Sequence, residues 1–232
     1  MKFQEKLLDS FIAFEQDIDL LNPIHTDRKN ALKRFEKQGF PSKKDESWKY
    51  TSLKSIIQKN YSLSSKSDKS VELRDVKKYF LNDLDSFKIV FVDGIYSPFL
   101  SKTTHDGMDI CVLSAALSKD KYKSTLKKYF NQIVPKDESL ASLNTSYTKE
   151  GAYIYIPKGV CPEDPVQIMH ISTGNQESIW LQPRNLIIAD KNSKVEIIER
   201  HQSLKGHSVV TNSLTEIYAE KNAFIDYYKI QN

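Results

Sequence analysis

Leu186 to His201 reads LIIADKNSKVEIIERH, and thirty residues later Glu216 to Gln231 reads EIYAEKNAFIDYYKIQ. In both stretches an apolar run leads into a polar turn that contains asparagine, and a second apolar run follows. The matching pairs are Ile187/Ile217, Ala189/Ala219, Asp190/Glu220, Lys191/Lys221, Asn192/Asn222, Val195/Ile225 and Glu196/Asp226. A fixed period of this length is typical of a stacked architecture, in which each strand–turn–strand unit covers its neighbour.

An earlier stretch, Tyr153 to Ile168, has the same outline with a longer turn that is rich in proline and glycine. We therefore predict that residues 140–232 are the start of a β-solenoid whose coils differ in length. The pattern also fits two similar antiparallel hairpins of a β-sandwich. The two alternatives differ in whether residues thirty apart lie in register on neighbouring parallel strands.

Residues 1–70 are predicted to form an N-terminal helical domain. Apolar side chains recur at helical spacing up to Asn22-Pro23, which is expected to end the first helix. They are Phe3, Leu7, Leu8, Phe11, Phe14, Ile18 and Leu21. Thr26 is the expected N-cap of a second helix, and Gly39 marks its C-terminal end. Residues 62–70 contain few apolar side chains and are the best linker candidate.

Residues 71–139 are predicted to be a mixed α/β connecting region, so the expected fold class is α+β. Phe87 to Val92 has the composition of a strand, and Asp93-Gly94 directly after it is a strong hairpin signal. Another strand is expected from Asp109 to Leu113. Apolar side chains recur near helical spacing through and beyond the lysine-rich residues 119–128, so the lysines are predicted to form the solvated side of an amphipathic helix.

The composition excludes several classes of protein. The 232-residue chain is 39% hydrophobic and 28% charged, which is typical of a folded protein with a core. Its net charge of +4 comes from interleaved basic and acidic residues, so no nucleic-acid partner is expected. No apolar run is long enough to cross a bilayer, and charges lie where a signal peptide needs apolar residues. We expect a cytoplasmic protein that does not bind membranes.

The two cysteines do not form a metal-binding motif. Cys161 lies between Gly159 and Pro162, in an expected exposed turn, and no second cysteine is near it in the sequence. Cys111 lies in a strand-like run, where packing is the usual role of a cysteine. Two isolated cysteines suit a reducing compartment.

Histidines and carboxylates are further candidates for a metal-binding or catalytic site. His201 and His207 have a spacing seen in zinc sites, but the paired cysteines of such sites are missing, and we expect both to flank a loop. His170 is expected to point inward from a strand as an ordinary core histidine. Stacking would place Glu196 above Asp226, a pairing that suits a glycan-cleaving enzyme. The carboxylates at 190, 196, 199 and 226 are more simply explained as an exposed face. The sequence therefore predicts no catalytic, cofactor-binding or metal-ligating residue.

Phe40 to Leu53 reads FPSKKDESWKYTSL, and its Glu46-Ser47-Trp48-Lys49-Tyr50-Thr51 core resembles a segment of the SufD branch of the SufB/SufD family. That family comprises scaffold proteins of iron–sulfur cluster assembly. Weaker similarities follow in the family's order at Leu143–Tyr147, at Ile154–Gly159 and at Pro183–Ile188. We expect Trp48 and Tyr50 to pin the helical domain to itself or to the β region.

The resemblance implies an N-terminal helical domain, a right-handed parallel β-helix and a C-terminal helical domain. The last of these is absent, so we expect the chain to be a truncated piece of a longer protein or a proteolytic product. The implied function is that of a non-enzymatic scaffold, which pairs with a SufB-like subunit and binds a SufC-like ATPase. A homodimer through the β-helix is a further assembly mode to consider. A transient iron–sulfur cluster belongs to the full-length complex, and this fragment is expected to bind none.

Two other functions remain open from the residues alone. A carbohydrate-active β-helix enzyme would use paired carboxylates, but the cysteine usage and the missing signal peptide count against it. An α+β protein-interaction module would lack stacking between Val195–Ile198 and Ile225–Tyr228.

Overall fold

A computed structural model describes residues 3–20, 22, 24–59, 61–63, 71–81, 85–104, 107–174, 178–206 and 209–232. Most of the predicted linker, residues 64–70, lies outside these ranges. The helices and 3-10 turns are α1 (Phe3–Gln16), α2 (Ile24–Gln38), η1 (Glu46–Trp48), α3 (Lys54–Ile57), α4 (Leu73–Val76), η2 (Lys77–Tyr79), η3 (Pro98–Leu100), α5 (Leu113–Ser118), η4 (Asp120–Tyr122), α6 (Lys123–Tyr129) and α7 (Ser139–Ser146). The strands are β1 (Phe87–Val92), β2 (Ile95–Tyr96), β3 (Asp109–Val112), β4 (Ala152–Ile156), β5 (Val166–Ser172), β6 (Ile179–Leu181), β7 (Arg184–Ala189), β8 (Lys194–Ser203), β9 (Val209–Thr211), β10 (Leu214–Ala219) and β11 (Phe224–Gln231).

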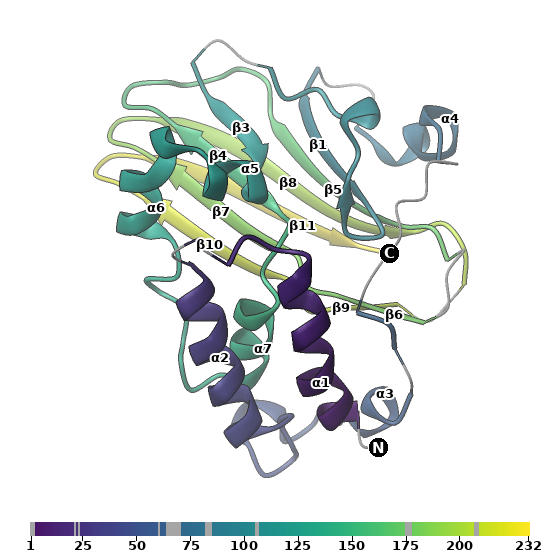
Figure 1. Ribbon diagram of the computed structural model, residues 1–232. Coiled ribbons are helices and arrows are strands. Elements are labelled where there is room, and N and C mark those ends of the chain that lie inside the picture. Colours follow the sequence, from purple (N-terminus) through teal and green to yellow (C-terminus); the bar gives the residue numbers. More distant parts are fainter. Residues whose placement is uncertain are drawn as a thin grey trace.

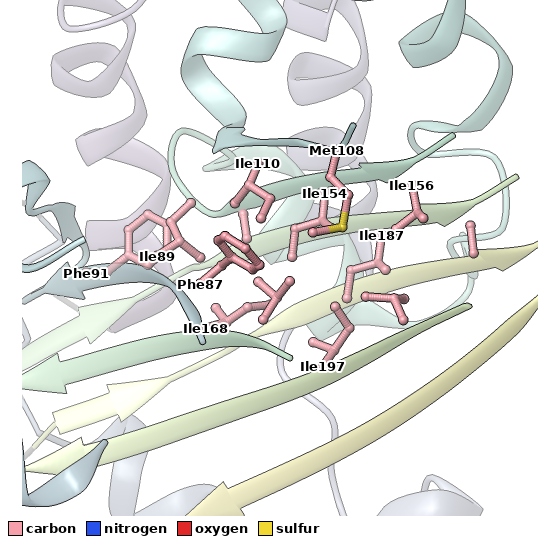
Figure 2. Close-up of a cluster of buried hydrophobic side chains, with 14 residues drawn as sticks. Phe87, Ile89, Phe91, Met108, Ile110, Ile154, Ile156, Ile168, Ile187 and Ile197 are labelled. Carbon is pink, nitrogen blue, oxygen red and sulfur yellow. The ribbon is translucent and has the colours of Figure 1, made fainter. Parts of the chain in front are cut away.

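Two sheets lie against each other and form the centre of this mixed α/β architecture (Figure 1). One has the strand order β11-β8-β5-β1-β2 and the other β10-β7-β4-β3, while β6 and β9 pair separately. Figure 2 shows isoleucine and phenylalanine side chains from both sheets filling the layer between them. This layer follows from strand alternation, because every second residue of each strand points to the same side of its sheet.

The thirty-residue repeat places its two copies side by side. β7 and β10 pair in parallel with Ile187 opposite Ile217, and β8 and β11 pair in parallel with Glu196 opposite Asp226. β7 and β8 belong to different sheets, so the alternative of two antiparallel hairpins is wrong. The predicted register is confirmed for both strands of the repeat.

The asparagines of the repeat occupy the same position in each polar turn. Asn192 and Asn222 have φ angles of 57° and 59°, in the left-handed region that asparagine tolerates better than most residues. The side-chain Nδ2 of Asn222 donates a hydrogen bond to Oδ1 of Asn192 at 3.0 Å. The turns therefore stack as the strands do.

The predicted Asp93-Gly94 hairpin is confirmed. Both residues have positive φ angles, 47° and 79°, as a two-residue hairpin turn of this kind requires, and β1 pairs with β2 in antiparallel fashion. β1 also pairs in parallel with β5, and β3 pairs with β4 in antiparallel fashion. The segment 71–139 thus contributes strands to both central sheets.

Helices cover the outer faces of both sheets (Figure 1). On the β4–β7 face, Tyr122 and Tyr129 from the lysine-rich segment are buried against strand residues such as Leu186, as its amphipathic pattern predicts. On the β1–β5 face, Val76 and Phe80 pack against outward-facing strand residues. The two sheets therefore form the middle layers of the molecule.

The N-terminal helices pack with α7 and with Trp180 of β6. Two details of these helices differ from the sequence prediction. α1 ends at Gln16, before Asn22. α2 begins at Ile24, so Thr26 lies within its first turn, and the Asn22 side chain accepts the Ile24 N–H instead. Gly39 does end α2, with φ +69° and its N–H donating to the Phe35 carbonyl.

The third difference concerns the segment just after residue 139, which was predicted to be β-rich. It forms α7, and the first strand beyond it, β4, begins at Ala152. Serine, threonine and asparagine are weak helix formers, but here all five such residues of α7 are buried. Tertiary packing therefore outweighs local preference in α7.

The Glu46–Thr51 segment lies on the surface and begins with the short turn η1. Trp48 is partly buried, whereas Tyr50 is 91% exposed, so the expectation that Tyr50 pins the helical domain is wrong.

Candidate functional site

The inner face of β8 changes from apolar to polar along the strand. Val195 and Ile197 belong to the apolar layer between the sheets, and the next two residues with the same parity are Glu199 and His201. Glu199 is fully buried, with 0% of its side chain exposed, and the His201 side chain is 12% exposed. A buried carboxylate needs compensating donors, because its transfer out of water is costly.

Glu199 finds those donors on four strands. Its Oε1 lies 2.6 Å from Nε2 of His201 on β8 and 3.2 Å from Nζ of Lys229 on β11. Its Oε2 accepts from Nδ2 of Asn185 on β7 at 3.1 Å, and from the hydroxyl of Tyr227 on β11. Thr215 on β10 adds a hydroxyl contact of 3.3 Å to the same oxygen. We name Glu199, His170, His201, Asn185, Thr215, Tyr227 and Lys229 the Glu199 cluster.

A column of three rings runs across the sheet beside this carboxylate. Phe91 of β1, His170 of β5 and His201 of β8 are direct cross-strand neighbours. The Phe91 and His170 rings stack with centroids 5.1 Å apart, and the His170 and His201 rings with centroids 4.6 Å apart. In Figure 2, Phe91 lies at one end of the apolar layer, so the histidines continue this layer as polar rings.

The surroundings change the proton affinity of both buried groups. Burial lowers the pKa of His170 to about 3, and unfavourable electrostatic interactions with His201 and Lys229 add to this shift, although Glu199 opposes it. Burial alone would raise the pKa of Glu199. The hydrogen bond from His201, the charge of Lys229 and the hydrogen bond from Tyr227 prevail and hold that pKa below its ordinary value. At neutral pH the cluster therefore contains an ionised carboxylate next to a neutral His170 imidazole.

His170 keeps one polar atom without a partner. Its Nε2 is buried and forms no hydrogen bond with any of the described residues. Ligand atoms of His170, Glu199 and His201 all lie within 4.8 Å of one another. The cluster thus offers two imidazoles and one carboxylate at a single point.

The three histidines that the sequence offers as candidates have different positions in the structure. His170 points inward as expected, but it lies in a polar cluster and its Nε2 lacks a partner. His201 lies within β8 and does not flank a loop, and His207 lies outside the described residues.

The carboxylates also divide into two groups. Glu196 and Asp226 are exposed and in register, as stacking predicted. The prediction that Glu199 belongs to the same exposed face is wrong. Glu199 lies three residues from Glu196, and residues an odd number apart point to opposite sides of a strand. Parity along β8 could have identified Glu199 as an inward-facing charge.

Both cysteines lie apart from the Glu199 cluster. Cys161 is exposed, and its Sγ lies 4.0 Å from the carbonyl oxygen of Asn192, at the turn between β7 and β8. Cys111 is half-buried in β3, and burial raises the pKa of its thiol. A raised pKa makes the reactive thiolate scarce at neutral pH, which agrees with a packing role for Cys111.

A second buried ion pair was not anticipated from the sequence. Nη2 of Arg184 on β7 lies 2.6 Å from Oε1 of Glu216 on β10, and both side chains are buried. Arg184 also contacts Thr145 of α7 at 3.2 Å, and its guanidinium lies over the ring of Phe130. This pair joins the helical segment before β4 to the stacked strands, so we assign it a structural role.

Comparison with known proteins covers nearly the whole chain. The family model described as the SufBD protein N-terminal region matches residues 1–168. The model described as the SUF system FeS cluster assembly SufBD core domain matches residues 170–232.

Individual relatives agree with the family models. An iron–sulfur cluster assembly SufBD family protein of Synechocystis sp. is 23% identical over 199 residues, which are 82% of this chain and 44% of the relative. A SufBD family protein of Guillardia theta is 31% identical over 191 residues, which are 74% of this chain and 38% of the relative. The iron–sulfur cluster assembly protein SufD of Escherichia coli is 26% identical over 205 residues, which are 86% of this chain and 44% of the relative. The chain spans less than half the length of these three relatives.

None of the helices in the described ranges combines the length and the apolar composition that a membrane span needs.

Proposed function

Because this chain belongs to the SufBD family of the SUF system for iron–sulfur cluster assembly, we propose that it is the N-terminal part of a SufD-type scaffold subunit. The observation that carries this proposal is the succession of two family models, one ending at residue 168 and the next beginning at residue 170. Similarity to the SufD protein of Escherichia coli supports assignment to the SufD branch, since it extends over 86% of the chain. The Glu46–Thr51 segment supports it as well.

We further propose that the strands from β4 onward are the first coils of a right-handed parallel β-helix. Three parallel pairings support this proposal, because β6/β9, β7/β10 and β8/β11 each join residues thirty apart. The coil before them is longer, with Tyr153 opposite Leu186 and Val166 opposite Ile197. The proposed division remains a helical domain at 1–70, a mixed region at 71–139 and the β-helix start at 140–232.

The proposed role of the full-length protein is to assemble clusters in the cytoplasm with a SufB-like subunit and a SufC-like ATPase. It would act as a scaffold without catalytic activity of its own and hold the iron–sulfur cluster only transiently within the complex. Pairing through the β-helix with a second copy of the chain is an alternative assembly. Family membership supports the scaffold role over the carbohydrate-enzyme alternative.

Affinity purification tests this proposal directly. The full-length protein, tagged and purified from its source cells, should retain SufB-like and SufC-like subunits, identified by mass spectrometry. The 232-residue chain alone should retain no SufC-like ATPase and should develop no cluster chromophore after anaerobic reconstitution. Purification of the full-length protein without either subunit would contradict the proposal.

A further inference from the structure

The Glu199 cluster combines a carboxylate that is fully hydrogen-bonded with a buried imidazole nitrogen that has no hydrogen-bond partner in the described part of the chain. Glu199 has partners on four strands, whereas the buried Nε2 of His170 has none among the described residues. A buried polar atom without a partner is unfavourable, and in a native structure it calls for a specific explanation. The cross-strand neighbour Phe91 shows that an apolar ring fits this column. An imidazole at position 170 therefore needs a reason beyond packing.

The His170 imidazole lies close to a carboxylate and to a second imidazole. Ligand atoms of His170, Glu199 and His201 lie within 4.8 Å of one another. Two ligands bound tetrahedrally to one zinc ion are about 3.4 Å apart, so a modest rotation of the side chains would bring these three to ligand distances. Two imidazoles and one carboxylate form a donor set that suits zinc and ferrous iron and that leaves coordination positions open.

The Glu199 carboxylate is oriented by hydrogen bonds to one of its oxygens, as metal-binding carboxylates usually are. Asn185, Thr215 and Tyr227 contact Oε2 of Glu199, and this leaves Oε1 directed toward His201. Such outer contacts fix the orientation of a ligand before the ion arrives.

Lys229 is the competing cation. Its Nζ lies 3.2 Å from Oε1 of Glu199, but the side chain is 33% exposed and also contacts the hydroxyl of Ser213 at 2.9 Å. The ammonium can therefore move toward solvent when another cation approaches.

We propose that His170, Glu199 and His201 bind one divalent transition-metal ion of the zinc or ferrous type, with Lys229 as the cation that the ion displaces. Binding is a ligand exchange without electron transfer. The ion takes the lone pairs of the histidine nitrogens and of Oε1, and the hydrogen on Nε2 of His201 moves to Nδ1 or to solvent. This site stands on the geometry of the chain itself and does not depend on the proposed scaffold function.

Titration with Co²⁺ as a spectroscopic probe tests the proposal. The purified protein should bind one Co²⁺ per chain saturably by calorimetry, with visible absorption bands of a nitrogen- and oxygen-ligated ion. His170→Phe and Glu199→Gln should each weaken binding by more than about 100-fold, a loss larger than outer contacts usually cause. Lys229→Met should tighten it. Glu196→Gln, on the same strand and the opposite face, is the matched control and should bind as the native protein does.

The fold of each variant is checked by circular dichroism, and His170→Phe is the preferred variant because Phe91 already stacks in the same column. Should Glu199→Gln fail to fold, the His170→Phe and Lys229→Met pair still tests the site, with opposite effects expected. Absence of saturable Co²⁺ binding by the native protein would overturn the proposal. Binding that His170→Phe leaves unchanged would also overturn it, since the ion would then lie elsewhere.

Discussion

The carboxylate of Glu199 and the imidazole of His201 lie two residues apart on β8 and meet at 2.6 Å inside the protein. Residues at i and i+2 of a strand point to the same side, and here that side is the interior between two sheets. The interaction ends the apolar layer of the core and begins its polar part. Its contribution to the stability of the fold depends on the charge of Glu199, because at least three donors face that carboxylate.

Substitution of Glu199 should destabilise the protein strongly. Glu199→Leu removes the carboxylate that faces Tyr227, His201 and Lys229 and should lower the free energy of unfolding by about 3–5 kcal/mol. Glu199→Gln keeps the shape but turns an NH₂ group toward donors, and should cost about 1–3 kcal/mol. Denaturant unfolding measures both. Glu196→Gln, on the exposed face, should change stability by less than about 0.5 kcal/mol, and an equal loss there would contradict the role of burial.

The Arg184–Glu216 pair should show strong coupling. Arg184→Met leaves the Glu216 carboxylate buried without its cation and should cost about 3–5 kcal/mol, as should Glu216→Leu. The double variant should lose less than the sum of the two, since neither charge then remains unpaired. A double-mutant cycle by denaturant unfolding measures this coupling, and additive losses would show that the pair contributes no interaction of its own.

Gly151 should tolerate no side chain. A Cβ at this position would lie 1.8 Å from the carbonyl oxygen of Arg184, which is backbone and cannot move without displacing β7. Gly151→Ala should therefore cost at least about 3 kcal/mol or abolish folding. At Gly206 a Cβ meets nothing within 4 Å, so Gly206→Ala should stay within about 0.5 kcal/mol of the native protein. Thermal unfolding compares the two, and equal midpoints would contradict the packing at Gly151.

Mild acid should destabilise the protein through His170. Above pH 6.5 this imidazole is neutral in both the folded and the unfolded chain. Between pH 6.5 and about 3, the unfolded chain takes up a proton that the folded chain does not, so stability falls as pH falls. The slope from this group is at most about 1.4 kcal/mol per pH unit, or roughly 2 kcal/mol between pH 6.5 and pH 5.

His170→Phe should remove that part of the pH dependence, measured by denaturant unfolding at pH 7 and pH 5 in the presence of a chelator. Glu199, His201 and Lys229 are the charged or titratable groups that act on His170, and all three remain in this variant. Identical pH profiles for the native protein and the variant would contradict the depressed pKa.

The sequence by itself determined the repeat and its register. Alternation along Val195 to Ile198 and along Ile225 to Tyr228 places one set of side chains inside, and matching turns force strands thirty residues apart to pair. The left-handed asparagines at 192 and 222 and the Asp93-Gly94 hairpin belong to the same category, because each depends on local backbone preference.

Only the tertiary structure decided which polar groups meet. The coil that contains β5 is longer than thirty residues, so His170 lies opposite His201 through a register that no repeat length predicts. α7 is a helix of weak helix formers, because buried contacts with Arg184 outweigh their local preferences. Glu199 could be placed on the inner face by parity, but its partners come from four strands whose positions depend on the whole stack. Local periodicity thus determines which way a side chain points, and long-range packing determines what it finds there.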